Sequence, residues 1–218
     1  MAATKKEQKN KNYHKSRFQF DPAREKVWRA IIEHLSPYIG ENKVVLDLGT
    51  GWGDFINGVQ AKKKWALDLG SDVKNNMNSD VIFINKASDQ LDDIPNKSLD
   101  VVFSSNLMEH LDGKQFTNTM EALKKKTKKN GTVILIGPNY KYAYKDYFDD
   151  YTHKTIYSHI SLADAMREYG FTPVKVVPKF LPLSLKSRLP KSYWLTRLYL
   201  TLPFSPMGKQ MLLIFRYE

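Results

Sequence analysis

The middle of the chain alternates short apolar runs with longer polar segments, and this alternation limits the fold more than any other feature. Runs rich in Val, Ile, Leu and Phe occur at 43–48, 64–69, 81–85, 99–104 and 132–137. The intervening segments 53–62 and 113–127 are long enough for crossover helices. Buried strands joined by helices are typical of a parallel sheet with helices on both faces. The sequence therefore predicts an α/β fold.

The last third of the chain extends this sheet. Ser161 as N-cap and Gly170 as stop signal bound a predicted helix at 161–169. Gly131 is expected to end the helix that precedes it. Two further strands are expected at 171–177 and 209–217. About seven strands then form one open sheet.

Length and composition restrict the class of protein. The 218 residues suit one domain with a sizeable core. We expect a cytoplasmic protein, because there is no apolar run of about 18 residues and no export signal at the start. The absence of cysteine excludes disulfides, a cysteine-based zinc site and a thiol nucleophile. Chemistry is left to carboxylates, histidines, hydroxyls and a cofactor, and no metal site is predicted.

The net charge of +11 favours an anionic partner. Residues 4–17 carry six basic side chains, one acid and no apolar periodicity, so we predict a basic flexible tail at 1–17 and one domain at 18–218. Lysines at 62–64 and within 124–129 are expected near helix ends, where cations offset the helix dipole. Nucleic acid stays open as a partner but is not favoured, because no RNA-binding signature is found.

The stretch VVLDLGTGWGDF at 44–55 places a glycine-rich loop after the first strand. A dinucleotide fingerprint would need a third glycine at position 54, where the chain has Asp54, and Asp47 would repel a pyrophosphate. A cationic cofactor without phosphates fits better, because a nearby carboxylate attracts a sulfonium or ammonium group. Asp68 ends the second strand, where a β-α-β unit places an acid that can bind ribose hydroxyls. Alone, such an acid is more often a helix N-cap.

Four features together resemble the class I S-adenosylmethionine-dependent methyltransferases: VVLDLGTGWGDF, the strand-end Asp68, SLDVVFSSNLMEHL and KKNGTVILIGPN. The resemblance runs from about residue 40 to 177. It implies a Rossmann-like sheet with strand order 3-2-1-4-5-7-6, the last strand antiparallel, and S-adenosylmethionine as the cofactor. The implied cofactor-binding residues are Asp47, Gly49, Thr50, Gly51 and Gly53 at the methionine and sulfonium end, Asp68 at the ribose, Asp89 near the adenine amino group, and Asn106 facing the transferred methyl group.

The second half resembles a bacterial subgroup of these enzymes associated with polysaccharide and lipopolysaccharide assembly, through the Asp-Tyr-Thr-His stretch at 150–153. Methyl transfer to a hydroxyl needs a base. His153 is the first candidate, because imidazole titrates near neutral pH, and Asp150 could orient it. His110, beside Glu109, is the second candidate. Both histidines could instead have structural roles.

Residues 179–207 form a basic amphipathic insertion between the last two strands, in which Trp194, Leu195, Leu198 and Leu202 share one helical face. Such a helix can lie peripherally on a membrane, with the basic tail as a second contact, or it can cover the sheet or another subunit.

The sequence predicts a methyltransferase that acts on an oxygen of a saccharide or lipid-linked glycan. The alternatives are a small-molecule or RNA methyltransferase and a non-catalytic adaptor that keeps the fold.

Overall fold

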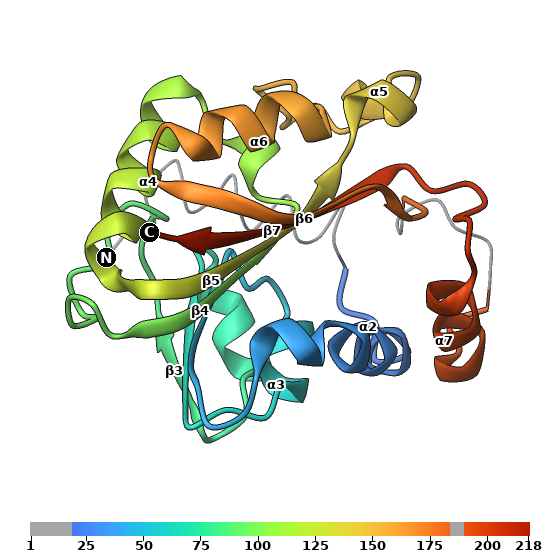
Figure 1. Ribbon diagram of the computed structural model, residues 1–218. Helices are drawn as coiled ribbons and strands as arrows, with labels where there is room; N and C mark the ends of the chain where they lie inside the picture. The colour runs from blue at the N-terminus through green and yellow to red at the C-terminus, as the bar shows by residue number, and fades with distance from the viewer. Residues whose placement is uncertain (1–18, 184–189) are drawn as a thin grey trace.

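A computed structural model describes residues 19–183 and 190–218. These residues form a seven-stranded sheet with the order β3-β2-β1-β4-β5-β7-β6 (Figure 1). The strands are β1 (Val44–Leu48), β2 (Lys63–Leu67), β3 (Val81–Ile84), β4 (Leu99–Ser105), β5 (Thr127–Pro138), β6 (Phe171–Leu181) and β7 (Gln210–Tyr217). The predicted fold class and strand order are confirmed.

Strand direction places the loops that carry the predicted site on one edge. Strands β1 to β5 pair in parallel, for example through Val45 with Val101 in β1 and β4. Strand β7 is antiparallel to both β5 and β6, as the resemblance implied. The carboxyl ends of β1, β2 and β4 therefore meet at the same edge, which is where open α/β sheets bind ligands.

Helices cover both faces of the sheet (Figure 1). Helices α4 (Gly113–Lys126) and α6 (His159–Arg167) bury Phe116, Met120 and Met166 against one face. Helices α2 (Arg24–Ile39) and α3 (Asp54–Gly58) bury Leu35 and Phe55 against the other. Helix α7 (Tyr193–Thr201) packs beside α2. The short elements are η1 (Ser71–Asn76), η2 (Met108–His110), α5 (Tyr140–Ala143) and η3 (Tyr147–Asp149).

Helix α2 was not anticipated from the sequence. It buries Ala30, Ile31, Leu35 and Ile39, which recur at helical spacing and form one side of the core. It ends at Gly40, whose φ of 72° suits glycine. This spacing is the signal that would have revealed the helix.

Two predicted helix boundaries were wrong. The helix expected at 53–62 is only α3, because Val59 is already extended. The N-cap of α6 is Ser158 and not Ser161, because the Ser158 hydroxyl accepts the Ser161 N–H at 3.1 Å while the Ser161 hydroxyl accepts the Ser158 N–H at 2.9 Å. This reciprocal capping box uses both serines, so the sequence alone left the choice ambiguous.

Two expectations about turns and charges also fail. Gly131 does not end a helix but lies inside β5, because α4 already ends at Lys126. Lys63 and Lys64 lie in β2 instead of near a helix end, and Lys64 is buried in an ion pair of 2.9 Å with Asp80. Lysines at 124–126 do occupy the last turn of α4, as expected.

The predicted tail at 1–17 lies outside the described residues, as does part of the insertion, 184–189. Within the described part of the insertion, β6 continues to Leu181 and α7 follows. Among the described residues, no helix combines the length and the apolar character needed to span a bilayer.

Candidate functional site

The loop after β1 is built from glycines in conformations that other residues rarely adopt. Gly49, Gly51 and Gly53 have φ angles of 75°, 52° and 81°, where a Cβ would cause strain. A Cβ on Gly49 would also lie 3.2 Å from the side chain of Leu107. The Gly49 N–H donates to the carbonyl oxygen of Leu67 at the end of β2, at 2.8 Å. The loop is thereby fixed at the carboxyl edge of the sheet.

Asp47 lies beneath this loop and is 2% exposed. Its Oδ2 accepts a hydrogen bond of 2.7 Å from the Thr50 hydroxyl. Burial raises the pKa of Asp47 to about 7; the Thr50 bond opposes this rise, and Asp68 adds to it. A positive charge placed nearby would favour the ionised carboxylate. The site is therefore able to respond to a cationic ligand.

Asp68 joins the loop after β1 to the loop after β2. Its Oδ2 accepts the Gly51 N–H at 2.9 Å, and its Oδ1 accepts the Gly70 N–H at 2.8 Å. The Asn85 amide donates to the Asp68 carbonyl oxygen at 2.9 Å. The structure thus brings Asp68 and the glycine loop together, as the sequence predicted, while binding of ribose stays a prediction.

The other two predicted cofactor residues lie further along the edge. Asn106 follows β4 with a φ of 54°, and its Oδ1 accepts a hydrogen bond of 3.0 Å from Gln210 at the start of β7. Asp89 lines a separate groove of about 510 Å³ with Asn118 and Glu121 of α4. Their contacts with the methyl group and with adenine stay predictions.

The stretch at 150–155 docks onto the stretch at 109–111, about forty residues earlier in the chain. The N–H groups of Lys154 and Thr155 both donate to the Glu109 carbonyl oxygen, at 2.8 and 3.1 Å. The Thr155 hydroxyl donates to the Leu111 carbonyl oxygen at 2.6 Å. These bonds hold the two stretches together at the carboxyl edge, beside the end of β4.

The side chains brought together by this docking form a compact group, which we call the histidine cluster: Glu109, His110, Asp150, Thr152 and His153. The rings of His110 and His153 lie 4.8 Å apart, edge to face. The ring of Tyr147 packs against His153 at 4.7 Å. All three predicted catalytic residues, His153, Asp150 and His110, therefore meet in one place.

Thr152 connects the two ends of the cluster. Its hydroxyl donates to Asp150 Oδ1 and lies 3.0 Å from His110 Nδ1. A hydroxyl has one proton to donate, so the His110 Nδ1–H must donate to Thr152. This fixes the tautomer of His110 and leaves its Nε2 with the lone pair. Burial, and next the neighbouring His153, lower the pKa of His110 to about 4, so the ring is neutral.

Glu109 is the most buried acid of the cluster, at 3% exposed. Its Oε1 has no hydrogen-bond partner among the described residues. Burial, with a smaller contribution from Asp150, raises the pKa of Glu109 to about 8. The adjacent cavity has a volume of only about 10 Å³, close to the least that holds one water. Little water can therefore hydrate this carboxyl group.

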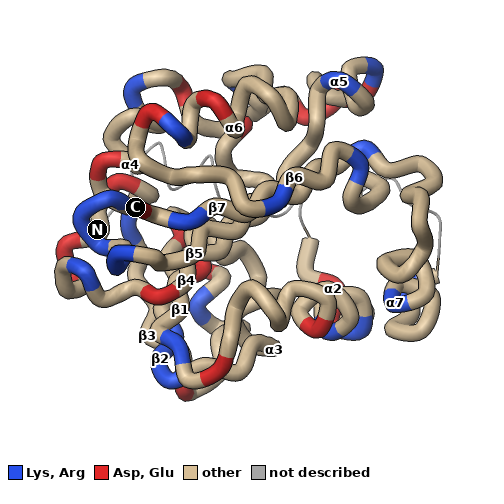
Figure 2. The backbone as a smooth tube through the Cα atoms, viewed as in Figure 1, with Lys and Arg blue, Asp and Glu red and all other residues tan. Residues whose placement is uncertain are grey.

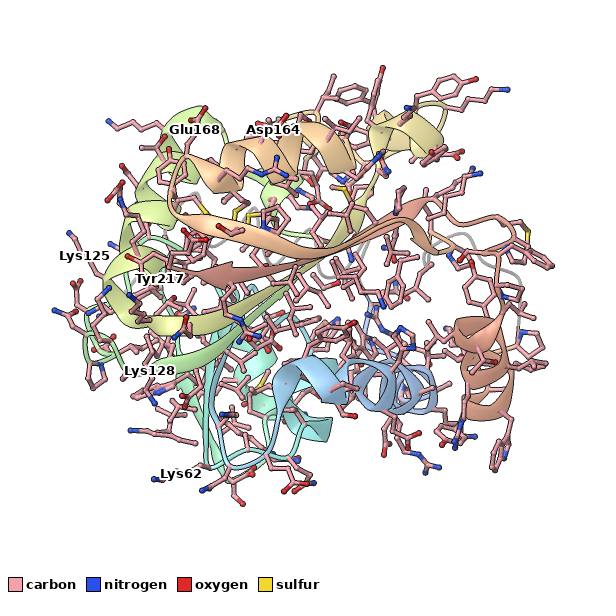
Figure 3. The ribbon with its side chains drawn as sticks, viewed as in Figure 1. Lys62, Lys125, Lys128, Asp164, Glu168 and Tyr217 are labelled. Carbon is pink, nitrogen blue, oxygen red and sulfur yellow. The ribbon has the colours of Figure 1, made fainter. Side chains whose placement is uncertain are left out.

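Within the described residues, a group of lysines lies at the opposite, amino-terminal edge of the sheet. Lys62 precedes β2, Lys125 lies in the last turn of α4 and Lys128 near the start of β5, and all three point outward near the amino ends of the strands (Figure 3). Other basic side chains are spread over α2, α5 and α7 (Figure 2). Near the histidine cluster, the exposed ring of Phe148 packs on Tyr147, and Tyr151, between Asp150 and Thr152 in the chain, is exposed as well.

Comparison with known proteins places this arrangement in a family. Residues 20–176 match the model of the methyltransferase domain. The chain belongs to this methyltransferase family. No curated protein matches the sequence significantly.

Solved methyltransferase structures share the fold of this family member. An S-adenosylmethionine-dependent methyltransferase from Archaeoglobus fulgidus is 21% identical, with a TM-score of 0.66 over 95% of this chain and 99% of that one. A Haloferax volcanii complex of a methyltransferase with its activator is 15% identical, with a TM-score of 0.65 over 99% of both chains. Geranyl diphosphate C-methyltransferase from Streptomyces coelicolor is 14% identical, with a TM-score of 0.60 over 87% of this chain and 78% of that one. Together with the family match, they confirm S-adenosylmethionine as the predicted cofactor.

Sequence reasoning missed the connections within the site. Thr152 was seen only as part of the Asp-Tyr-Thr-His stretch, and Glu109 only as the neighbour of His110. Their roles depend on the docking of 150–155 onto 109–111. The one available signal was that two histidine-containing stretches both follow predicted strands, which places them at one edge.

Proposed function

We propose that this methyltransferase transfers the methyl group of S-adenosylmethionine to a hydroxyl oxygen of a saccharide, free or carried by a lipid, in the cytoplasm. The observation that carries the proposal is the position of the histidine cluster. The cluster lies after β4, at the same edge as the glycine loop after β1. Leu107, two residues before Glu109, packs against Gly49 of that loop. A cofactor held by the loop would present its methyl group toward the cluster.

The reaction is an in-line displacement. A lone pair of the acceptor oxygen forms a bond to the methyl carbon while the C–S bond breaks, and its electron pair stays on sulfur. The acceptor hydroxyl gives up its proton, so a group that activates this hydroxyl speeds the reaction. The cluster supplies such groups: His153 as the candidate base and His110 as the second candidate, with Asp150 holding Thr152 against the His110 ring. The ring contact between the two histidines supports a joint role.

The surroundings of the cluster favour a saccharide acceptor. Tyr151, between Asp150 and Thr152 in the chain, exposes its ring, and the exposed ring of Phe148 packs on Tyr147, which contacts His153. An aromatic ring with a polar tip suits a ligand that has apolar faces and a rim of hydroxyl groups. The resemblance of the 150–153 stretch to methyltransferases of polysaccharide and lipopolysaccharide assembly points to the same class.

Helix α7 supports a lipid-linked acceptor. Its contacts with α2 include Arg197 and the hydroxyl of Tyr193, which lie 3.9 and 2.6 Å from Glu33, while Leu200 packs against the core. Its apolar side chains Trp194 and Leu198 point to solvent and are 71% and 60% exposed. An exposed apolar helix face is suited to the interfacial region of a membrane. We therefore include peripheral membrane contact in the proposal.

The cofactor part is tested by calorimetry with Asp68→Ala. Binding of S-adenosylmethionine should weaken by at least about a hundredfold, because two hydrogen bonds to a charged group contribute about 1.5 to 3 kcal/mol each. Asp164→Ala on the exposed face of α6 is the matched control and should bind normally (Figure 3). Unfolding curves show whether both variants are folded. Unchanged affinity in a folded Asp68→Ala protein would refute the ribose assignment.

The acceptor part is tested with a donor that carries a labelled methyl group. Label should enter lipid-linked or free glycans of the source cell, and alkali-stable ether linkage should identify oxygen as the methylated atom. Label in RNA or in a small non-sugar metabolite would favour the alternative enzymes. A folded protein that binds no S-adenosylmethionine would favour the adaptor.

A further inference from the structure

We infer that Glu109, His110 and His153 bind a divalent cation. This inference rests on the proposed function only for the role of the ion, not for its binding. One carboxylate oxygen of Glu109 and one nitrogen of each imidazole lie within 4.8 Å of one another. A carboxylate and two histidines form a known ligand set for catalytic Zn²⁺ and non-haem Fe²⁺, with positions left open for a substrate.

Glu109 gives the first reason for a cation. Its carboxyl group is buried, its Oε1 has no hydrogen-bond partner among the residues the structure describes, and water can barely reach it. A buried acid of this kind is costly unless it is paired or coordinates a metal. The nearby lysine, Lys154, pairs instead with Asp112 and Gln115, at 3.7 and 2.7 Å. A cation between Glu109 and the histidines would compensate the carboxylate.

The hydrogen bonds around His110 give the second reason. The Asp150–Thr152–His110 relay keeps the proton on Nδ1 and leaves the Nε2 lone pair for a ligand bond. Histidines that bind metals nearly always donate their other ring N–H to an oxygen that fixes the tautomer. The Thr152 contact thus orients the His110 ring for metal binding, in which a neutral imidazole nitrogen is the ligand.

The geometry limits the choice of ion. Two ligands of one ion lie at most about 4.2 Å apart when each bond is about 2.1 Å, so the 4.8 Å cluster closes around an ion by small side-chain movements. Two nitrogen ligands favour Zn²⁺, Mn²⁺, Fe²⁺ or Co²⁺ over Mg²⁺, which prefers oxygen. Tyr151, two residues before His153 in the chain, exposes its ring to solvent on the side where an acceptor would enter.

The ion would bind the acceptor hydroxyl through its oxygen and lower the pKa of that hydroxyl. The proton then leaves to water, the oxygen bonds to the methyl carbon, and the C–S electron pair stays on sulfur. With the ion bound, the two histidines would hold it, and the ion would then activate the acceptor hydroxyl in place of the base role proposed above for His153 or His110. Thr152 is a positioning residue, because it acts through His110.

The test uses the full chain without a histidine tag, stripped with EDTA, in the absence of donor and acceptor. Titration with Co²⁺, followed by visible absorption, and with Zn²⁺, followed by calorimetry, should give one ion per chain. Glu109→Gln and His153→Ala should weaken binding by more than about tenfold, and Thr152→Val by about tenfold through the lost tautomer lock. His34→Ala on α2, on the other face of the sheet, is the matched control and should bind normally.

Binding of S-adenosylmethionine by each variant shows that it is folded. The inference is overturned if neither Co²⁺ nor Zn²⁺ binds with one ion per chain, or if both Glu109→Gln and His153→Ala still bind the ion normally. Methyl transfer that continues at full rate in EDTA overturns the role of the ion. Ion binding that meets these criteria, with no methyl transfer to any glycan, upholds the site while it refutes the proposed acceptor.

Discussion

At the scale of single residues, the two acids of the cofactor loop are the clearest case of sequence predicting structure. Asp47 and Asp68 were identified from their positions at strand ends, and the structure joins both to the glycine loop. Strand ends can be read from local apolar patterns, so such residues are predictable. The role of Thr152 could not be predicted in this way, because its partner His110 lies 42 positions away in the chain.

Asp47 should make cofactor binding depend on pH. Its pKa in the folded protein is raised to about 7, so below that pH a cationic ligand must first displace a proton. Affinity for S-adenosylmethionine should therefore rise as the pH increases through 7 and level off above it, with a limiting slope of about tenfold per unit on the acid side. Calorimetry across this range measures the effect.

Asp47→Asn should flatten this profile, because its amide does not ionise. Asp164→Asn, which changes an exposed acid of α6, should keep the profile of the unaltered protein. A wild-type profile in Asp47→Asn would show that another group controls the effect.

At the scale of elements, the strands were predicted in the right places, although β5 and β6 are longer than expected, and the helix ends were predicted less well. A buried strand is marked by its own apolar residues, whereas the start of α6 depends on which of two serines caps it. Helix α7 was predicted as amphipathic, and its apolar face proves to be the exposed one. The sequence could not show which side faces α2, because that choice depends on pairing with Glu33.

The exposed face of α7 should bind lipid vesicles. Replacing Trp194 and Leu198 by Ser should weaken binding to anionic vesicles by at least about tenfold, since each buried side chain contributes about 1.5 to 3 kcal/mol. Co-sedimentation measures the change. Ile82→Ser, an exposed apolar residue of β3, is the control and should have no effect. Equal sedimentation of all variants would argue against membrane contact through this helix.

At the scale of the whole molecule, the strand order came from the family resemblance and not from local patterns. Apolar runs mark strands but do not say which strands pair, so β7 between β5 and β6 could not be derived from them. The net charge of +11 proves equally uninformative about the site. Among the described residues, Lys62, Lys125 and Lys128 lie at the amino edge, away from the glycine loop (Figure 3).

This separation predicts that cofactor binding depends little on salt. Raising the salt from about 0.1 M to about 1 M shortens the Debye length from about 10 Å to about 3 Å. Affinity for S-adenosylmethionine should change by less than about threefold, because buried Asp47 is screened little. An RNA bound along the lysine edge would dissociate steeply over the same range. A comparably steep loss of cofactor affinity would contradict the assigned position of the donor.

The docking of 150–155 onto 109–111 has a consequence for engineering. The acceptor region is assembled from two stretches that interlock through backbone and side-chain hydrogen bonds. If only one stretch were replaced by that of a relative, the stretch that remains would lose the groups to which it hydrogen-bonds. A swap of substrate preference between members of this family should therefore move both stretches as a single cassette.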